Sequence, residues 1–176
     1  MPQETTGEPK ILLDCDVIIH FLKGEKILEL PQIFPGRFIL LDKVYKELLK
    51  RNSNVLAIGV FLAQTGIPVL AMPSDNVIAK EYFSLKKIMD DGEAACLSVA
   101  KHCKEYVASS NITQIEKYCR DNDIVFYTTM DLLLEAEQKG IMTEPECDVF
   151  IGKVKSKSSK LPCNTIKEYK TMKGID

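Results

Sequence analysis

Short apolar runs alternate with longer segments of helical periodicity along this chain. Five short apolar runs predict β-strands at 10–14, 37–41, 67–72, 105–110 and 124–129. Apolar residues with the spacing of amphipathic helices predict helices over 17–23, 42–51, 54–66, 74–87, 90–103, 111–123, 130–140 and 143–155. Segment 28–36 contains two prolines and a glycine, so we expect a turn-rich link there.

The alternation of strands and helices determines the predicted fold class. Strands that are joined through helices build a parallel sheet with helices on both faces. The sequence therefore predicts an α/β protein with three layers, α/β/α, around a central, mostly parallel five-stranded sheet. The apolar run at 54–62 is expected to form core or a homodimer surface rather than a ligand site.

The chain length and the distribution of charge predict how the chain is divided into domains. A chain of 176 residues is long enough for one domain with a substantial core. Its net charge is −2, yet residues 153–174 carry seven lysines and one acid. We therefore expect a flexible N-terminus over 1–9, one α/β domain over 10–152 and a basic C-terminal tail over 153–176.

The basic tail has two interpretations. It is either a solvated, mobile end of the chain or a surface that binds RNA phosphates. Under the second interpretation, the nucleic-acid-binding residues are Lys153, Lys155, Lys157 and Lys160.

Cysteine spacing and apolar run length indicate the compartment. The six cysteines form no C-x-x-C pair, and several lie in apolar segments, which favours reduced thiols. The first ten residues lack the basic and apolar regions of a signal peptide. The apolar runs are too short to span a bilayer. The sequence thus predicts a cytoplasmic protein without membrane contact.

Acidic side chains gather where the predicted strands end. Asp14 follows the first strand, Glu47 lies on the helix after the second strand, and Glu93 lies on the helix before the fourth. Asn111 follows the fourth strand. Open parallel sheets bind ligands beyond the carboxyl ends of their strands, and crowded carboxylates favour a bound cation. Mg²⁺ and Mn²⁺ prefer oxygen ligands and activate water for phosphodiester hydrolysis.

A purely structural interpretation is also open for Asp14, Asp16 and Glu47. Asp14 is a cation ligand, an exposed strand end, or a group that accepts backbone N–H bonds. Asp16 is favoured as the cap of the following helix, with a supporting role at the site as the alternative. Glu47 borders the apolar stripe of its helix, but it also belongs to a lysine-rich face that solvent can cover.

The later polar residues carry the same ambiguity. Glu93 follows Asp90 by three positions, which is the spacing of a capping box. Asn111 is either a site residue or the cap of the helix that follows it. Asp131 is a further acid after the fifth strand, and it is not included in the predicted site.

Five motifs in this order resemble the PIN-domain family. They are "ILLDCDVIIHFLK", "DKVYKELLK", "MDDGEAACLSVAK", "VASSN" and "IVFYTTMDLLLEAEQKG". The resemblance covers about residues 10–150. Many members of this family are bacterial toxin ribonucleases of toxin–antitoxin pairs, and the last motifs are most similar to PIN proteins that bind nucleic acid and have uncertain activity.

The resemblance implies a metal-dependent ribonuclease that cuts single-stranded RNA, with RNA and an antitoxin protein as partners. Asp14, Glu47 and Glu93 would be the catalytic residues and, with Asn111, would hold Mg²⁺ or Mn²⁺. The family usually has an aspartate where this chain has Asn111. An amide oxygen can bind a cation but brings no charge, so this difference is expected to weaken cation binding.

Two competing functions follow from the same residues. The substitution at Asn111 favours a catalytically weakened PIN-like module that binds RNA or protein without cutting. The pair Asp14 and Asp16 also resembles the D-x-D motif of haloacid-dehalogenase-like phosphotransferases, in which the first Asp is a nucleophile. That family requires a later acidic G-D pattern, which this sequence lacks.

Overall fold

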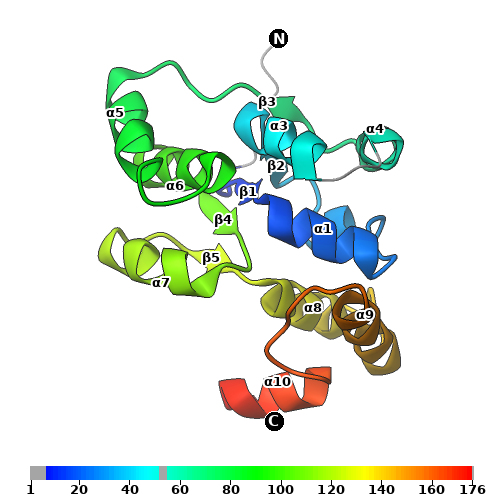
Figure 1. Cartoon of the computed structure of the whole chain (residues 1–176). Coiled ribbons are helices and arrows are strands. Elements are labelled where there is room, and N and C mark those ends of the chain that lie inside the picture. Colours follow the sequence, from blue (N-terminus) through cyan, green and yellow to red (C-terminus); the bar gives the residue numbers. More distant parts are fainter. Residues whose placement is uncertain (1–6, 52–54, 176) are drawn as a thin grey trace.

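Five short strands, namely β1 (Ile11–Leu13), β2 (Phe38–Leu41), β3 (Val69–Leu70), β4 (Tyr106–Ala108) and β5 (Phe126–Tyr127), form one sheet. The computed structural model describes residues 7–51 and 55–175. Within them the strand order is β3–β2–β1–β4–β5, and every strand pair is parallel. Figure 1 shows this sheet nearly edge-on, with β3 at the top and β5 lowest. The predicted fold class is confirmed.

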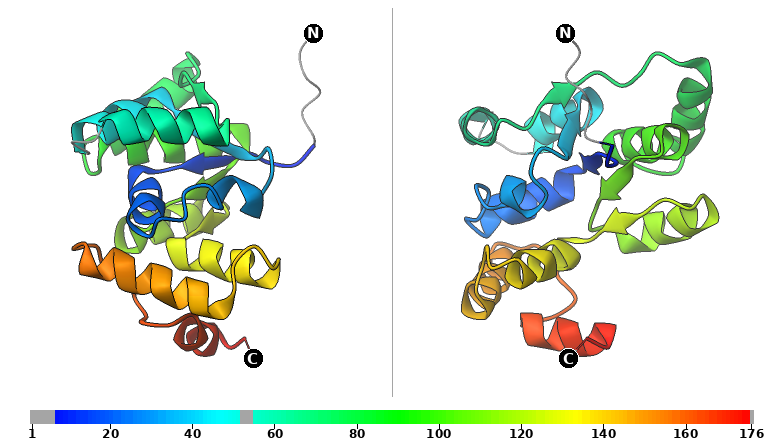
Figure 2. Two further views of the ribbon diagram at one scale, coloured as in Figure 1. Left: turned by 90° about the vertical axis from the view of Figure 1, so that its right-hand side faces the viewer. Right: turned by 180° about the vertical axis from the view of Figure 1, so that it is seen from behind.

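Helices cover both faces of the sheet. They are α1 (Cys15–Lys23), α2 (Leu30–Ile33), α3 (Asp42–Arg51), α4 (Val55–Thr65), α5 (Asn76–Leu85), α6 (Asp91–Cys103), α7 (Ile112–Asp121), α8 (Thr129–Gln138), α9 (Glu144–Ser156) and α10 (Ile166–Lys173). Helices α5, α6 and α7 lie on one side, and α1 and α4 lie on the other (Figures 1 and 2). This division gives the three predicted layers.

Burial explains why the central strand and its helix form where they do. All three residues of β1 are buried, as expected for a central strand with helices on both faces. On α1, Phe21 packs edge-on against Phe150 of α9, with ring centroids 5.0 Å apart. Gly24, at the end of α1, allows this close approach, because a Cβ atom there would overlap the Phe150 ring. Helices α1 and α9 therefore form one packed unit.

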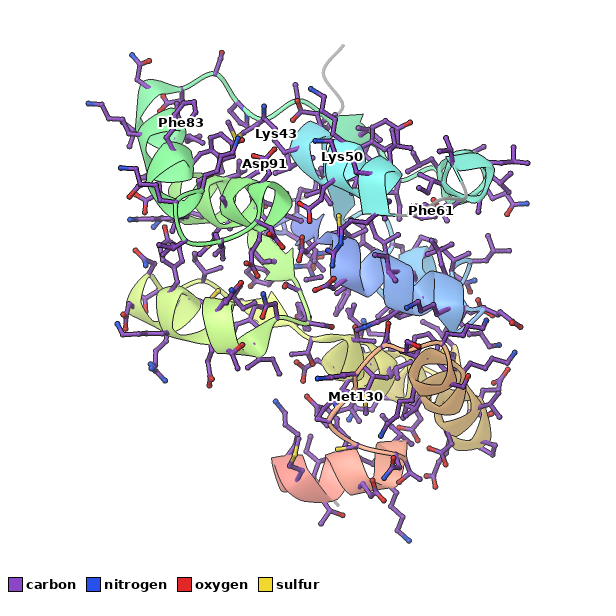
Figure 3. The ribbon with its side chains drawn as sticks, viewed as in Figure 1. Lys43, Lys50, Phe61, Phe83, Asp91 and Met130 are labelled. Carbon is purple, nitrogen blue, oxygen red and sulfur yellow. The ribbon has the colours of Figure 1, made fainter. Side chains whose placement is uncertain are left out.

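The sheet register determines where the functional side chains begin. Leu13 of β1 is paired with Ala108 of β4. The backbone N–H of Asp14 then donates to the Ala108 carbonyl at 2.9 Å, which continues the ladder by one residue. Asp14 and Ser109 consequently leave the sheet side by side at its carboxyl edge. Helices α3 and α6 pack against each other, and Figure 3 labels Lys50 near the end of α3 and Asp91 at the start of α6.

Two local predictions were wrong. The link at 28–36 contains the short helix α2, because Pro31 is well accommodated in a first helical turn. A second prediction from the sequence, that Asp42 caps the helix over 42–51, is also wrong: α3 begins at Asp42 itself, and the Asp42 side chain accepts a hydrogen bond from Met72 N at 3.0 Å. The same carboxylate therefore joins α3 to the chain that follows β3.

The C-terminal segment 153–176 is folded where the structure describes it. Its first residues complete α9, and α10 then packs against α8 and α9. Ile166 and Tyr169 are buried against the domain core. The predicted flexible N-terminus, 1–9, lies mostly outside the described residues. On α4, part of the predicted 54–62 run, Leu56 is 77% exposed while Phe61 is buried, and a homodimer at this helix stays a prediction.

Candidate functional site

Asp14 is a buried carboxylate at the carboxyl end of β1. Its side chain is 5% exposed, and Ser109 Oγ donates to its Oδ2 at 3.2 Å. Asp14 occupies the N-cap position of α1, but its side chain makes no capping hydrogen bond. Burial raises the pKa of Asp14 to about 7, with further contributions from Asp16 and Glu47. The interpretation of Asp14 as an exposed strand end is therefore wrong.

Glu93 is the second buried acid of the site, in the first turn of α6. It is 3% exposed, and neither of its carboxylate oxygens has a hydrogen-bond partner within the described part of the chain. The capping-box interpretation is wrong, because Asp90 holds the N-cap position without any side-chain bond. Burial raises the pKa of Glu93 to about 8, and the charge of Asp14 makes the largest contribution after burial. The two acids therefore share one neighbourhood.

Glu47 joins α3 to the start of α6. Its Oε2 accepts a hydrogen bond from Gly92 N at 2.8 Å. A Cβ atom at residue 92 would lie 2.8 Å from that oxygen and 3.3 Å from Val44 Cα, so the approach of the two helices requires glycine. The interpretation of Glu47 as one more charge on a solvated face is wrong, since its side chain is only 15% exposed.

Asn111 lies at the start of α7 and close to Glu93. Its side chain opposes the rise in the pKa of Glu93 that burial and neighbouring acids cause. Its Nδ2, however, donates to Gln114 at 2.6 Å rather than to Glu93. Asn111 holds the N-cap position of α7 without a side-chain capping bond. Asn111 therefore occupies the predicted N-cap position of α7, but its side chain does not cap the helix.

The predicted ligand set occupies one region without forming a closed cage. Asp14 links the three acids, because Glu47 contributes to the raised pKa of Asp14 and Asp14 contributes to the raised pKa of Glu93. Across residues 7–51 and 55–175, no group of three or more His, Cys, Asp or Glu side chains is close enough to hold a metal ion as it stands. The donor chemistry is suitable for Mg²⁺ or Mn²⁺, because all donors are oxygens and Glu93 has two without partners.

Arg51 is a site residue that the sequence analysis did not identify. Its guanidinium forms ion pairs with Asp16 at 3.1 Å and with Glu47 at 3.3 Å. The predicted cap role of Asp16 is wrong, since Asp14 holds that position and Asp16 faces Arg51. The four-residue spacing of Glu47 and Arg51 on α3 was the available signal. The guanidinium of Arg51 thus places beside Asp16 and Glu47 a positive charge that a bound metal ion would otherwise provide.

Replacement of Arg51 by Gln is expected to raise the affinity for Mn²⁺ about three- to tenfold, because two carboxylates lose a competing cation. Stability should fall by no more than about 1 kcal/mol, since Arg51 is 44% exposed and its ion pairs are screened. Calorimetric titration of the variant with Mn²⁺ measures the change. Arg120→Gln, an exposed arginine on α7, is the matched control, and unchanged or weaker affinity of Arg51→Gln would contradict the assignment.

A hydroxyl and imidazole cluster adjoins the acids, and the sequence analysis did not identify it. His20 Nδ1 lies 2.8 Å from Thr129 Oγ1, which lies 2.5 Å from Ser110 Oγ. Burial lowers the pKa of His20 to about 4, so the imidazole is neutral at pH 7. The cluster joins α1, the β4–α7 turn and the start of α8.

The four lysines predicted to bind nucleic acid have different surroundings. Lys153 and Lys157 form ion pairs with Glu25 at 2.6 and 3.2 Å, and Lys155 donates to Asn164 at 2.5 Å. Lys157 also lines a cleft of about 600 Å³ that contains Asp16, Arg51 and Lys23. Lys160 lines a different pocket, described below. Lys157 therefore shares a cleft with Asp16 and Arg51, whereas Lys160 lines a separate pocket beside Ser110.

No protein-family model matches this chain, and no curated protein matches it significantly. Among the described helices, none is both long and apolar enough to cross a membrane. The resemblance to PIN domains thus stays a prediction that depends on the motifs and on the site geometry.

Proposed function

We propose that the chain is a divalent-cation-dependent ribonuclease of the PIN type that hydrolyses single-stranded RNA beside Asp14 and Glu93. The observation that carries the proposal is the Glu93 carboxylate, which is almost fully buried and has no partner for either oxygen among the described residues. An unpartnered buried carboxylate is costly, and a second buried acid nearby adds repulsion. A Mg²⁺ or Mn²⁺ ion is the partner that these oxygens suit.

The residues around the acid pair have distinct roles in this proposal. Asp14 and Glu93 would hold the cation, and Glu47 and Asn111 would add oxygen atoms. When bound, such an ion supplies Lewis acidity and lowers the pKa of water. Ser109 orients the Asp14 carboxylate by its hydrogen bond.

The flanking cations suit the RNA backbone. Arg51, Lys23 and Lys157 line the cleft of about 600 Å³ beside Asp16. Cationic side chains around an acidic centre attract phosphates while the acids are reserved for the metal ion. Lys23 donates to Ser159 at 2.7 Å, which holds the wall of this cleft together.

Cleavage of a labelled single-stranded RNA oligonucleotide tests the proposal. The protein is expected to cut the RNA in Mn²⁺ and to leave it intact in EDTA, because only the loaded acid pair activates water. Absence of cleavage in Mn²⁺, or equal cleavage in EDTA, would contradict it.

A second candidate is a module that binds RNA or protein without cutting. Two observations favour it: Asn111 brings no charge to the site, and Arg51 already neutralises Asp16 and Glu47. Asn111→Asp separates the candidates in the same assay, with Asn122→Asp at the far end of α7 as the control of equal charge. Under the nuclease proposal, Asn111→Asp changes the rate by less than about tenfold. A rise of about 100-fold from background would instead favour the binding module.

A further inference from the structure

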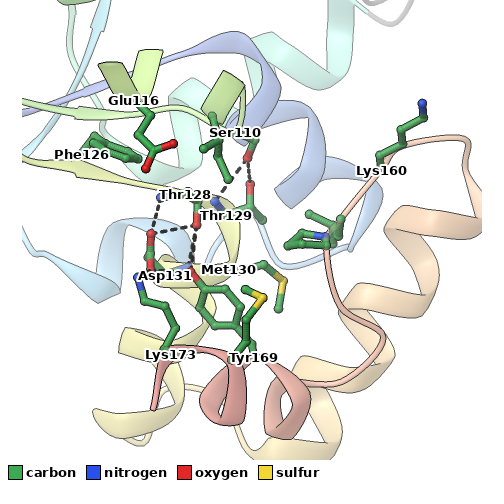
Figure 4. A pocket seen from close by; sticks show the side chains of 14 residues that line it. Ser110, Glu116, Phe126, Thr128, Thr129, Met130, Asp131, Lys160, Tyr169 and Lys173 are labelled. Atoms are coloured by element: carbon green, nitrogen blue, oxygen red, sulfur yellow. Dashed lines mark hydrogen bonds and ion pairs between the residues drawn. The ribbon is translucent and has the colours of Figure 1, made fainter. Parts of the chain in front are cut away.

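A pocket of about 390 Å³ lies on the other side of the β4–α7 turn from the acid pair. We name it the α10 pocket after the helix that forms one of its walls. Its walls include Ser110, Phe126, Met130, Lys160, Tyr169 and Met172. Figure 4 shows Ser110, Thr128 and Thr129 along one side and Tyr169 of α10 beneath them. Its volume falls in the range of small-molecule sites, about 300–1,000 Å³.

The β4–α7 turn connects this pocket to the acid site through three consecutive residues. Ser109 donates to Asp14 at 3.2 Å, and Asn111 lies close enough to Glu93 to lower its pKa. Ser110, between them, faces the α10 pocket and the Thr129 hydroxyl. One short turn thus forms the boundary between the acid pair and the pocket.

The α10 pocket suits a flat apolar group whose negative charge lies on the Lys160 side of the rim, because the carboxylates of Glu116 and Asp131 also line the pocket on the side away from Lys160 (Figure 4). Phe126, Tyr169 and the two methionines provide aromatic and apolar surface. Lys160 is exposed at the rim, and within the described residues it makes no hydrogen bond or ion pair. Lys173 also lines the pocket, but it is paired with Asp131 at 3.3 Å. Lys160 is therefore the cation that is available to a ligand.

We infer that the α10 pocket binds the base of a nucleotide, with Lys160 on the attached phosphate. Bases of single-stranded RNA stack on aromatic side chains, and basic side chains bind their phosphates. The place of this site in RNA cleavage rests on the proposed function: the bound nucleotide would neighbour the phosphodiester that is cut. Nucleotide binding in the pocket itself requires no metal ion.

Methionine methyl NMR tests the inference, because Met130 and Met172 line the α10 pocket while Met72 and Met142 do not. Protein with ¹³C-labelled methionine methyl groups is titrated in EDTA with AMP, with adenosine and with inorganic phosphate. AMP and adenosine are expected to shift the Met130 and Met172 signals saturably and to leave Met72 and Met142 unchanged. Phosphate alone should leave all four unchanged.

Two lysine variants add a matched comparison. Lys160→Glu is expected to weaken AMP binding about tenfold, the effect of losing one charge-assisted contact, and to leave adenosine binding unchanged. Lys167→Glu makes the same charge change elsewhere on the exposed C-terminal segment and should leave both unchanged. Equal losses in the two variants would overturn the role of Lys160.

The remaining outcomes test the nucleotide site and the nuclease proposal separately. Unshifted Met130 and Met172 signals at millimolar AMP, or equal shifts with phosphate alone, would overturn the nucleotide site. Specific shifts in a protein that does not cut RNA in Mn²⁺ would support the nucleotide site and contradict the nuclease proposal. Failure of the inference and failure of the proposed function are thus distinguishable.

Discussion

Replacement of Glu93 by Gln is expected to lower Mn²⁺ affinity and RNA cleavage by more than about 100-fold, while it stabilises the cation-free protein. Even residues that merely support metal ligands usually contribute 10- to 100-fold, and Glu93 supplies the two unpartnered oxygens of the site. In EDTA at pH 8.5, loss of this buried charge should raise the free energy of unfolding by about 1–3 kcal/mol. Calorimetry with Mn²⁺ and urea unfolding in EDTA measure the two effects.

The opposite signs of these effects distinguish a cation ligand from a residue needed only for folding. Glu116→Gln is the matched control, because Glu116 is exposed on α7. It should change neither Mn²⁺ affinity nor stability. Wild-type Mn²⁺ affinity in Glu93→Gln, or lower stability of that variant in EDTA at pH 8.5, would contradict the role of Glu93.

The stability of the cation-free protein is expected to fall as the pH rises from 6.5 to 8.5. Burial raises the pKa of Asp14 to about 7 and that of Glu93 to about 8, so the folded state keeps these protons at a pH where the unfolded chain has released them. The free energy of unfolding therefore decreases with rising pH through this window, by on the order of 1–3 kcal/mol. His20, whose pKa is lowered to about 4, acts mainly below pH 6.5, and its effect has the opposite sign.

Urea unfolding at several pH values, with EDTA or with saturating Mn²⁺, measures this dependence. Mn²⁺ should stabilise the protein more at pH 8.5 than at pH 6.5, because the ion competes with protons for the same oxygens. The double variant Asp14→Asn, Glu93→Gln should show a flatter profile in EDTA. A wild-type stability that is constant or rising over this window would contradict the assigned pKa shifts.

Sequence reasoning predicted the sheet and its edge because local signals and topology agree there. The apolar run before Asp14 indicates a central strand, and the alternation with helices places Asp14 and the start of the β4–α7 turn at the same sheet edge. Gly92 is an informative residue in retrospect, since only glycine allows Glu47 to reach its backbone. The sheet, its carboxyl edge and the role of Gly92 can all be traced to short-range sequence patterns and to the parallel topology.

The errors arose where distant partners decide the role of a side chain. Asp16 suited a helix cap in sequence, but Arg51, 35 positions later, pairs with it. The spacing of Asp90 and Glu93 suited a capping box, yet Glu93 is buried away from that backbone. The α10 pocket depends on how the C-terminal helix packs on α8, which no local pattern specifies.

A crystal of the wild-type protein soaked in Mn²⁺ and measured at the manganese absorption edge tests the central claim most directly. The proposal predicts an anomalous peak within direct coordination distance of a carboxylate oxygen of Asp14 and one of Glu93. A crystal that shows manganese only elsewhere, or none at a saturating concentration, would contradict it.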